Sequence, residues 1–124
     1  MAADKGAVTM QIGEVAERTQ LSLRTLRHYD QVGLVPPSAR SEGGFRLYTE
    51  ADVTRLHHVR RITPLGFSLD ETAEILKLLE GEHTDTAIHD VLERAQAARA
   101  KMARKLRQAD EFIDTLRHLD QSDR

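Results

Sequence analysis

The chain has 124 residues, of which 40% are hydrophobic and 31% charged, and its 18 basic and 20 acidic side chains give a net charge of -2. This length favours one compact domain with a real core over two ordinary domains. The absence of cysteine excludes disulfides, thiolate metal sites and cysteine nucleophiles. No apolar run approaches the ~18 residues of a membrane span and the first residues lack a secretory signal, so a cytoplasmic protein is expected.

Positive charge is concentrated in one stretch of the chain. Residues 18–61 contain eight arginines and four carboxylates, a net charge of +4, whereas residues 71–124 carry a net charge of -3. Seven glycines and prolines lie between Gly33 and Gly66, so the basic stretch is also rich in turns. A net charge of -2 alone argues against a general polyanion binder, and scattered surface arginines are the alternative interpretation.

The first ordered elements are two short helices. After an expected disordered tail over residues 1–8, the spacing of Ile12, Val15 and Ala16 predicts an amphipathic helix that ends near Thr19. Ser22 can accept a hydrogen bond from a backbone N–H one turn ahead, which predicts a second helix from Leu23 to Val32. Gly33 ends that helix. The expected apolar positions of the second helix are Leu23, Leu26 and Val32. Two such helices joined by about three residues outline a helix-turn-helix.

The next segment is predicted to be a small hairpin, or wing. Pro36-Pro37 forces an extended backbone. Strand-like residues lie on either side of a loop that spans roughly residues 38–44, with Leu34-Val35 before it and residues 45–48 after it. The loop carries Arg40.

Two further helices have clear starts. Thr49-Glu50-Ala51-Asp52 and Ser68-Leu69-Asp70-Glu71 both fit a capping box. The first predicts a helix that ends near residues 64–66, where Pro64 can end it early, and the second predicts a helix that stops at Gly81.

The last predicted helix is the longest, because residues 85–120 contain no glycine or proline. At ~1.5 Å per residue it would span roughly 54 Å. Its apolar residues repeat with the 4–3 spacing of a coiled coil. A second copy of the chain is the simplest partner for this stripe, and folding back on the same domain is the alternative. The expected dimerisation residues are Ile88, Leu92, Ala95, Met102, Leu106, Ala109, Ile113 and Leu116. A parallel series widens the stripe at its ends: Val91, Ala98, Lys105, Phe112 and Leu119.

Five sequence blocks, in order and in register, resemble the MerR family of bacterial transcription regulators. The blocks cover about residues 10–80, and they are Ile12–Ala16, Ser22–Asp30, Gly33–Pro37, Gly44–Tyr48 and Leu65–Leu69. Two positions depart from the common pattern, because His28 and Phe45 stand where many members have tyrosine.

This resemblance implies a mainly α fold. A winged helix-turn-helix domain with a small β-wing is expected over residues 9–81. A dimerisation helix that pairs as an antiparallel coiled coil is expected over residues 84–121, followed by a tail at residues 122–124. No C-terminal effector domain is expected.

The resemblance also implies a function. A homodimer would bind a pseudo-palindromic operator in a promoter and distort the spacer DNA, so that RNA polymerase can engage both promoter elements. Arg27 is the best candidate to read a base, because arginine can bind guanine through two hydrogen bonds. Packing is the favoured role for Phe45, and Tyr29 and Tyr48 could be partly core. The DNA-binding residues carried over are Ser22, Arg24, Thr25, Arg27, His28, Tyr29, Arg40, Phe45, Arg46, Tyr48, Arg60 and Arg61.

Other functions are weighed against this one. The first is an architectural DNA-bending factor of the excisionase type, without a regulatory ligand, and the second is a coiled-coil adaptor. An enzyme is disfavoured, because no phosphate-binding loop or clustered nucleophile and base is present. No cofactor or metal is expected, although a site made of histidines across a dimer is conceivable. The protein would either bind no small molecule or hold one between the long helix and the DNA-binding domain.

Overall fold

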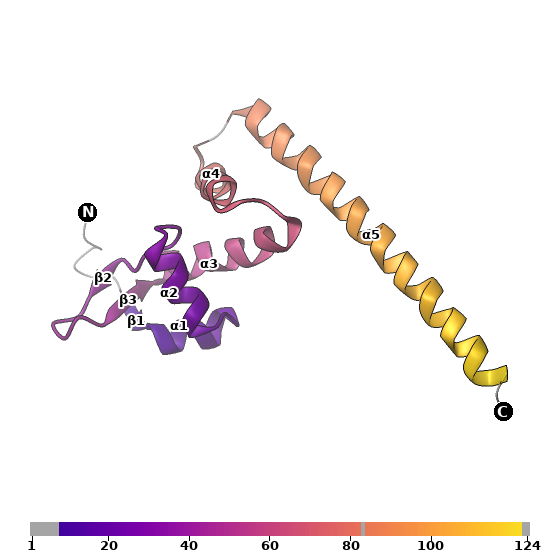
Figure 1. The fold of residues 1–124 in the computed structure, drawn as a ribbon. Coiled ribbons are helices and arrows are strands. Elements are labelled where there is room, and N and C mark those ends of the chain that lie inside the picture. The colour runs from indigo at the N-terminus through magenta and orange to yellow at the C-terminus, as the bar shows by residue number, and fades with distance from the viewer. Residues whose placement is uncertain (1–7, 83, 123–124) are drawn as a thin grey trace. The chain divides into compact units, whose positions relative to one another are not determined.

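The structure is a computed structural model that describes residues 8–82 and 84–122. It divides into two compact units, with the boundary after Glu82. The first unit holds three short strands and four α-helices, and the second is one long helix, α5 (Asp85–Ser122) (Figure 1). The expected tail lies outside the described residues except for Val8, and so do residues 123–124. Ser122, which the sequence assigned to the C-terminal tail, belongs to α5.

The first two helices form the predicted helix-turn-helix. α1 (Ile12–Thr19) and α2 (Leu23–Gln31) are separated by three residues. Gln20 makes the turn with a left-handed backbone (φ 60°), and its N–H donates to the Ala16 carbonyl at 2.9 Å. Ser22 caps α2 as expected, because its hydroxyl accepts from the Thr25 N–H at 3.0 Å.

The small sheet differs from the predicted hairpin in its first strand. Its order is β1-β3-β2, with β1 (Thr9–Gln11) and β2 (Ala39–Arg40) both antiparallel to β3 (Arg46–Thr49). Leu34-Val35, predicted as a strand, is not one. Both N–H groups donate to the Tyr29 carbonyl, at 2.9 and 3.2 Å, so these residues close the end of α2 instead. Their β-like composition reflects burial, since Val35 is fully buried.

Both predicted capping boxes are present. They start α3 (Glu50–Ile62) and α4 (Leu69–Leu79), which are joined through the short 3-10 helix η1 (Thr63–Leu65). In the first box the buried Asp52 carboxylate accepts from the Thr49 N–H at 2.9 Å and from the Ser38 hydroxyl at 2.5 Å. The same carboxylate therefore caps α3 and holds the segment that leads into β2.

The core of the first unit is formed by residues from every helix and from the sheet. Leu23 and Val32, two of the expected apolar positions of α2, are 40% and 46% exposed. Leu23 is the first residue of the helix and Val32 its C-cap, so neither lies on the buried stripe. The buried apolar side chains are Met10, Val15, Leu26, Tyr29, Val35, Tyr48, Val53, Leu56, Val59, Ile62, Ile75 and Leu76.

The long helix α5 lies in the second unit. It has 38 residues, and none of those that the structure describes is buried. Within residues 8–82 and 84–122, no helix is long and apolar enough to cross a membrane.

Candidate nucleic-acid interface

Helix α2 presents a row of polar and cationic side chains because two apolar residues fix its other face. Leu26 and Tyr29, three positions apart, are 1% and 8% exposed and anchor the helix in the core. Arg24, Arg27 and His28 are exposed. The Ser22 hydroxyl also donates to the Thr25 side chain at 2.8 Å, which orders the first turn.

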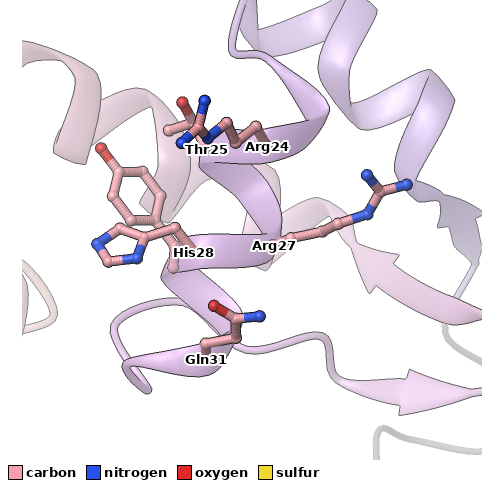
Figure 2. Close-up of a pocket in the computed structure, with 6 residues that line it drawn as sticks. Arg24, Thr25, Arg27, His28 and Gln31 are labelled. Carbon is pink, nitrogen blue, oxygen red and sulfur yellow. The ribbon is translucent and has the colours of Figure 1, made fainter.

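The outward side chains of α2 line an open hollow on the surface (Figure 2). Arg27 extends to one side of the helix and His28 to the other, so their polar ends are well separated. The hollow also includes Gln31, which is not among the predicted DNA contacts. Its position three residues beyond His28, on the same face of a helix, was the signal that could have found it. Guanidinium, imidazole and amide groups on the exposed part of one helix can donate to phosphates and to base edges.

Two tyrosines predicted as DNA contacts have very different surroundings. Tyr29 is mostly buried but borders the hollow, and its ring centroid lies 6.1 Å from that of His28. Tyr48 is fully buried, so the prediction that it contacts DNA is wrong. The reason is its register in β3, opposite the buried Met10. Burial raises the pKa of both phenols above the usual tyrosine value.

The wing, formed by β2, β3 and the loop 41–45 between them, is tied to α2 by one carboxylate. Asp30, near the end of α2, accepts from Arg46 Nε at 2.7 Å and from an Arg40 guanidinium nitrogen at 3.2 Å, both through Oδ2. Arg40 also donates to the Gly44 carbonyl at 3.3 Å. No local pattern points to Asp30, because its partners are 10 and 16 residues away along the chain. Asp30 thus holds the two wing arginines beside α2.

The tip of the wing carries an exposed aromatic ring. Phe45 is 63% exposed, so the packing role favoured for it is not in the core. A side chain placed on Gly43 would come within 3.2 Å of the Phe45 ring, which shows that the ring lies across this glycine.

Two further predicted residues lie at the end of α3. Arg60 and Arg61 are both exposed, in the last turn of that helix. The neighbouring Arg55, by contrast, is engaged with Glu80 of α4, with Nε 2.6 Å from the carboxylate. The last turn of α3 thus offers two guanidinium groups to a phosphate.

No group of three or more potential metal ligands occurs among residues 8–82 and 84–122. His83 falls outside those ranges.

The comparisons with known proteins agree with this architecture. A family model described as "MerR HTH family regulatory protein" matches residues 10–79, and a second, described as "MerR, DNA binding", matches residues 53–119. Each spans more than half of the chain. The protein belongs to the MerR family. The sequence-based recognition is therefore confirmed, as is the winged helix-turn-helix fold followed by a long helix.

Individual MerR relatives cover most of this chain. The HTH-type transcriptional regulator HmrR of Rhizobium leguminosarum is 39% identical over 110 residues, which is 89% of this chain and 83% of the relative. A MerR-family regulator from Bacillus cereus matches with a TM-score of 0.65 at 30% identity, covering 92% of this chain and 79% of that one. HiNmlR, a MerR family regulator lacking the sensor domain and bound to promoter DNA, matches with a TM-score of 0.69 at 27% identity, covering 83% of this chain and 80% of its own.

Proposed function

We propose that this MerR-family protein is a sequence-specific transcription regulator that binds a pseudo-palindromic promoter operator as a homodimer and distorts the spacer DNA. The observation that carries the proposal is the cationic face of α2, where Arg24 and Arg27 are exposed. Asp30 of the same helix binds the wing arginines Arg40 and Arg46, which keeps them next to this face. A related structure of the same fold is bound to promoter DNA, which supports this use of the face.

The roles divide by position. α2 enters the major groove, where Arg27 reads a base and Arg24, Thr25 and His28 contact base edges or flanking phosphates. The DNA backbone on either side is contacted by Arg40 of the wing and by Arg60 and Arg61 in the last turn of α3. Phosphate contacts fix the register, and the base contacts supply specificity.

The apolar stripe along α5 supports the homodimer. Ile88, Leu92 and Leu116 are 42%, 50% and 48% exposed. Two recognition helices held at a fixed separation read two half-sites, so the operator mirrors the two-fold symmetry of the protein. Distortion of the DNA between the half-sites would allow RNA polymerase to engage the promoter, in the bacterial cytoplasm.

Selection from a random-sequence DNA pool tests this proposal. The full-length protein should enrich an inverted repeat, and a circular-permutation mobility assay on the enriched sequence should detect a bend. Enrichment of single half-sites would contradict the homodimer, and absence of any enriched sequence would contradict sequence-specific binding.

A further inference from the structure

A carboxylate lies among the cationic side chains of the candidate interface. Asp30 is in the last turn of α2, and its side chain is 15% exposed. We propose that Asp30 strengthens DNA binding despite its negative charge, because it positions Arg46 of the wing for a phosphate contact. Asp30 is then a positioning residue that acts through Arg46. This inference rests on the proposed function and deepens it.

The place of Asp30 in α2 is unfavourable for the helix itself. The carbonyl groups at the C-terminal end of a helix carry partial negative charge, so a carboxylate in the last turn is repelled. The first turn of α2, where a carboxylate would stabilise the helix, has no acidic residue. The stability of α2 therefore does not explain Asp30, and its role has to come from its contacts with the wing.

Those contacts offset a repulsion within the wing. Arg40 of β2 is paired directly with Arg46 of β3 in the register of the sheet. Like charges directly opposite each other on antiparallel strands destabilise the pairing, and β2 has only two residues. Oδ2 of Asp30 lies 2.7 Å from Arg46 Nε and 3.2 Å from an Arg40 guanidinium nitrogen. The same carboxylate oxygen thus stabilises both cations.

The two arginines are held to different degrees. Arg46 makes the shorter contact with Asp30, and its side chain is 25% exposed, against 50% for Arg40. Arg40 divides its donors between Asp30 and the Gly44 carbonyl, at 3.2 and 3.3 Å, which are long distances for a charged donor. Arg46 is therefore the arginine whose place Asp30 fixes most firmly.

A guanidinium group held in this way is prepared for a phosphate. An arginine side chain loses conformational entropy when it is immobilised, and for Arg46 part of this cost is met on folding instead of on DNA binding. The contact with Asp30 uses Nε, so the terminal nitrogens of Arg46 can donate to phosphate oxygens. Two guanidinium groups and one carboxylate leave a net charge of +1, which still attracts a phosphate.

Replacing Asp30 by asparagine gives a test in which the sign of the change is informative. By charge alone, Asp30→Asn should tighten DNA binding about twofold, from a Coulomb interaction over ~10 Å in water. If Asp30 positions Arg46, the variant should instead bind about tenfold more weakly, because a charge-assisted contact is loosened. The slope of log affinity against log salt should also fall by about 1. Fluorescence anisotropy with the selected operator and with a random-sequence duplex measures both quantities.

Glu42 provides a matched control for the change in charge. It is an exposed carboxylate in the loop of the wing, and Glu42→Gln makes the same change in net charge as Asp30→Asn. The control should bind DNA equally well or up to about twofold more tightly. Similar losses of affinity in both variants would overturn the positioning role, since the loss would not be specific to Asp30.

A double-mutant cycle tests whether Asp30 acts through Arg46. Arg46→Gln removes the phosphate contact itself, so the addition of Asp30→Asn to that variant should change DNA affinity by less than about twofold. The same tenfold loss in both backgrounds would overturn the positioning role, because Asp30 would then affect binding without Arg46.

Hydrogen exchange at the Arg46 Nε–H tests the contact in the wild-type protein and needs no variant at Asp30. The signal is assigned by its disappearance in Arg46→Lys. We expect it to be protected from exchange in the free protein and in the DNA complex, because the contact with Asp30 persists when the terminal nitrogens meet a phosphate. Loss of this protection on DNA binding would overturn the positioning role.

The proposed function and the role of Asp30 fail in different ways. A wild-type protein that binds neither duplex would overturn the proposed function itself. A wild-type protein that binds DNA, with Asp30→Asn binding equally well or more tightly, would overturn only the role of Asp30.

Discussion

Tyr48 lies in the middle of β3, where the alternation of the strand turns its ring into the core. The side chain is fully buried, and its hydroxyl has no hydrogen-bond partner among the described residues. A buried hydroxyl without a partner loses its bonds to water and gains nothing in return. The residue is therefore structural rather than part of the DNA interface.

Removing this hydroxyl should leave DNA binding unchanged. We expect Tyr48→Phe to keep operator affinity within about twofold and to leave the free energy of unfolding equal or up to about 1 kcal/mol higher. Fluorescence anisotropy and urea unfolding measure the two quantities. A clear loss of operator affinity with an unchanged free energy of unfolding would show that the Tyr48 hydroxyl does contact DNA.

Arg27 projects from the exposed face of α2 and is the residue we assign to base reading (Figure 2). Arg27→Ala should weaken binding to the selected operator by about 1–3 kcal/mol and relax the preference at one base position. Binding of the variant to a panel of operators, each changed at one position, checks this. The same loss on random DNA would show that Arg27 contacts only the backbone.

Arg60 is assigned to a phosphate, and a phosphate contact, unlike a base contact, does not depend on the DNA sequence. Arg60→Ala should weaken binding to the operator and to random DNA by similar factors, and should reduce the slope of log affinity against log salt by about 1. Titrations at several salt concentrations measure this slope. An unchanged slope would remove Arg60 from the phosphate contacts.

The local structure around the candidate site could be predicted where a short-range pattern exists. The cap at Ser22 and the exposure of Arg24 and Arg27 follow from helix periodicity and a local hydrogen bond. Asp30 could not be predicted as the anchor of the wing, because its two arginine partners come close only after the sheet has formed.

At the scale of elements, an exposed ion pair joins α1 to the start of α3. Both Arg18 guanidinium nitrogens donate to the Glu50 carboxylate, at 2.6 and 2.7 Å. The hydrogen bonds from Arg18 lower the pKa of Glu50 below its usual value of 4.5. A carboxyl whose pKa is lower in the folded state stabilises the fold above its unfolded pKa, and this contribution is lost as the pH falls through the folded value.

Glu50→Gln should therefore lower Tm at pH 7, and the difference from the wild type should shrink as the pH falls below 4.5. Thermal melts between pH 7 and pH 3 measure the difference. Glu42→Gln, which removes an exposed carboxylate from the wing loop, is the control. A difference that stays constant over this range would show that the ion pair is not its source.

The elements themselves were predictable to different degrees. Helices α2, α3 and α4 begin at the capping residues that the sequence identified, because a cap is a local interaction. The strand β1 was missed, since three residues carry little pattern and their pairing with β3 spans about 40 positions of the chain. Leu34-Val35 was assigned to a strand because buried apolar residues have the same composition whether or not they pair.

At the scale of the whole molecule, we expect the two units to have separate tasks, so that α5 makes the dimer and the first unit folds without it. Leu106→Asp/Ile113→Asp should yield a folded monomer, because two carboxylates in the apolar stripe of α5 would lose their water when two copies pair. Light scattering measures the mass and circular dichroism the helix content. Arg104→Asp/Glu111→Asp makes the same change in net charge at the same spacing on the outward face and should remain dimeric. If Leu106→Asp/Ile113→Asp remained dimeric, the dimer interface would not include these two positions of the stripe.

Genome-wide mapping of the bound sites tests the central claim most directly, namely that this protein regulates promoters by reading a two-fold symmetric DNA sequence. We expect the sites to share an inverted repeat, to lie between promoter elements and to be lost in the Arg27→Ala variant. Sites scattered outside promoters, without a common repeat and unchanged by that variant, would contradict the claim and would favour an architectural role in bending DNA.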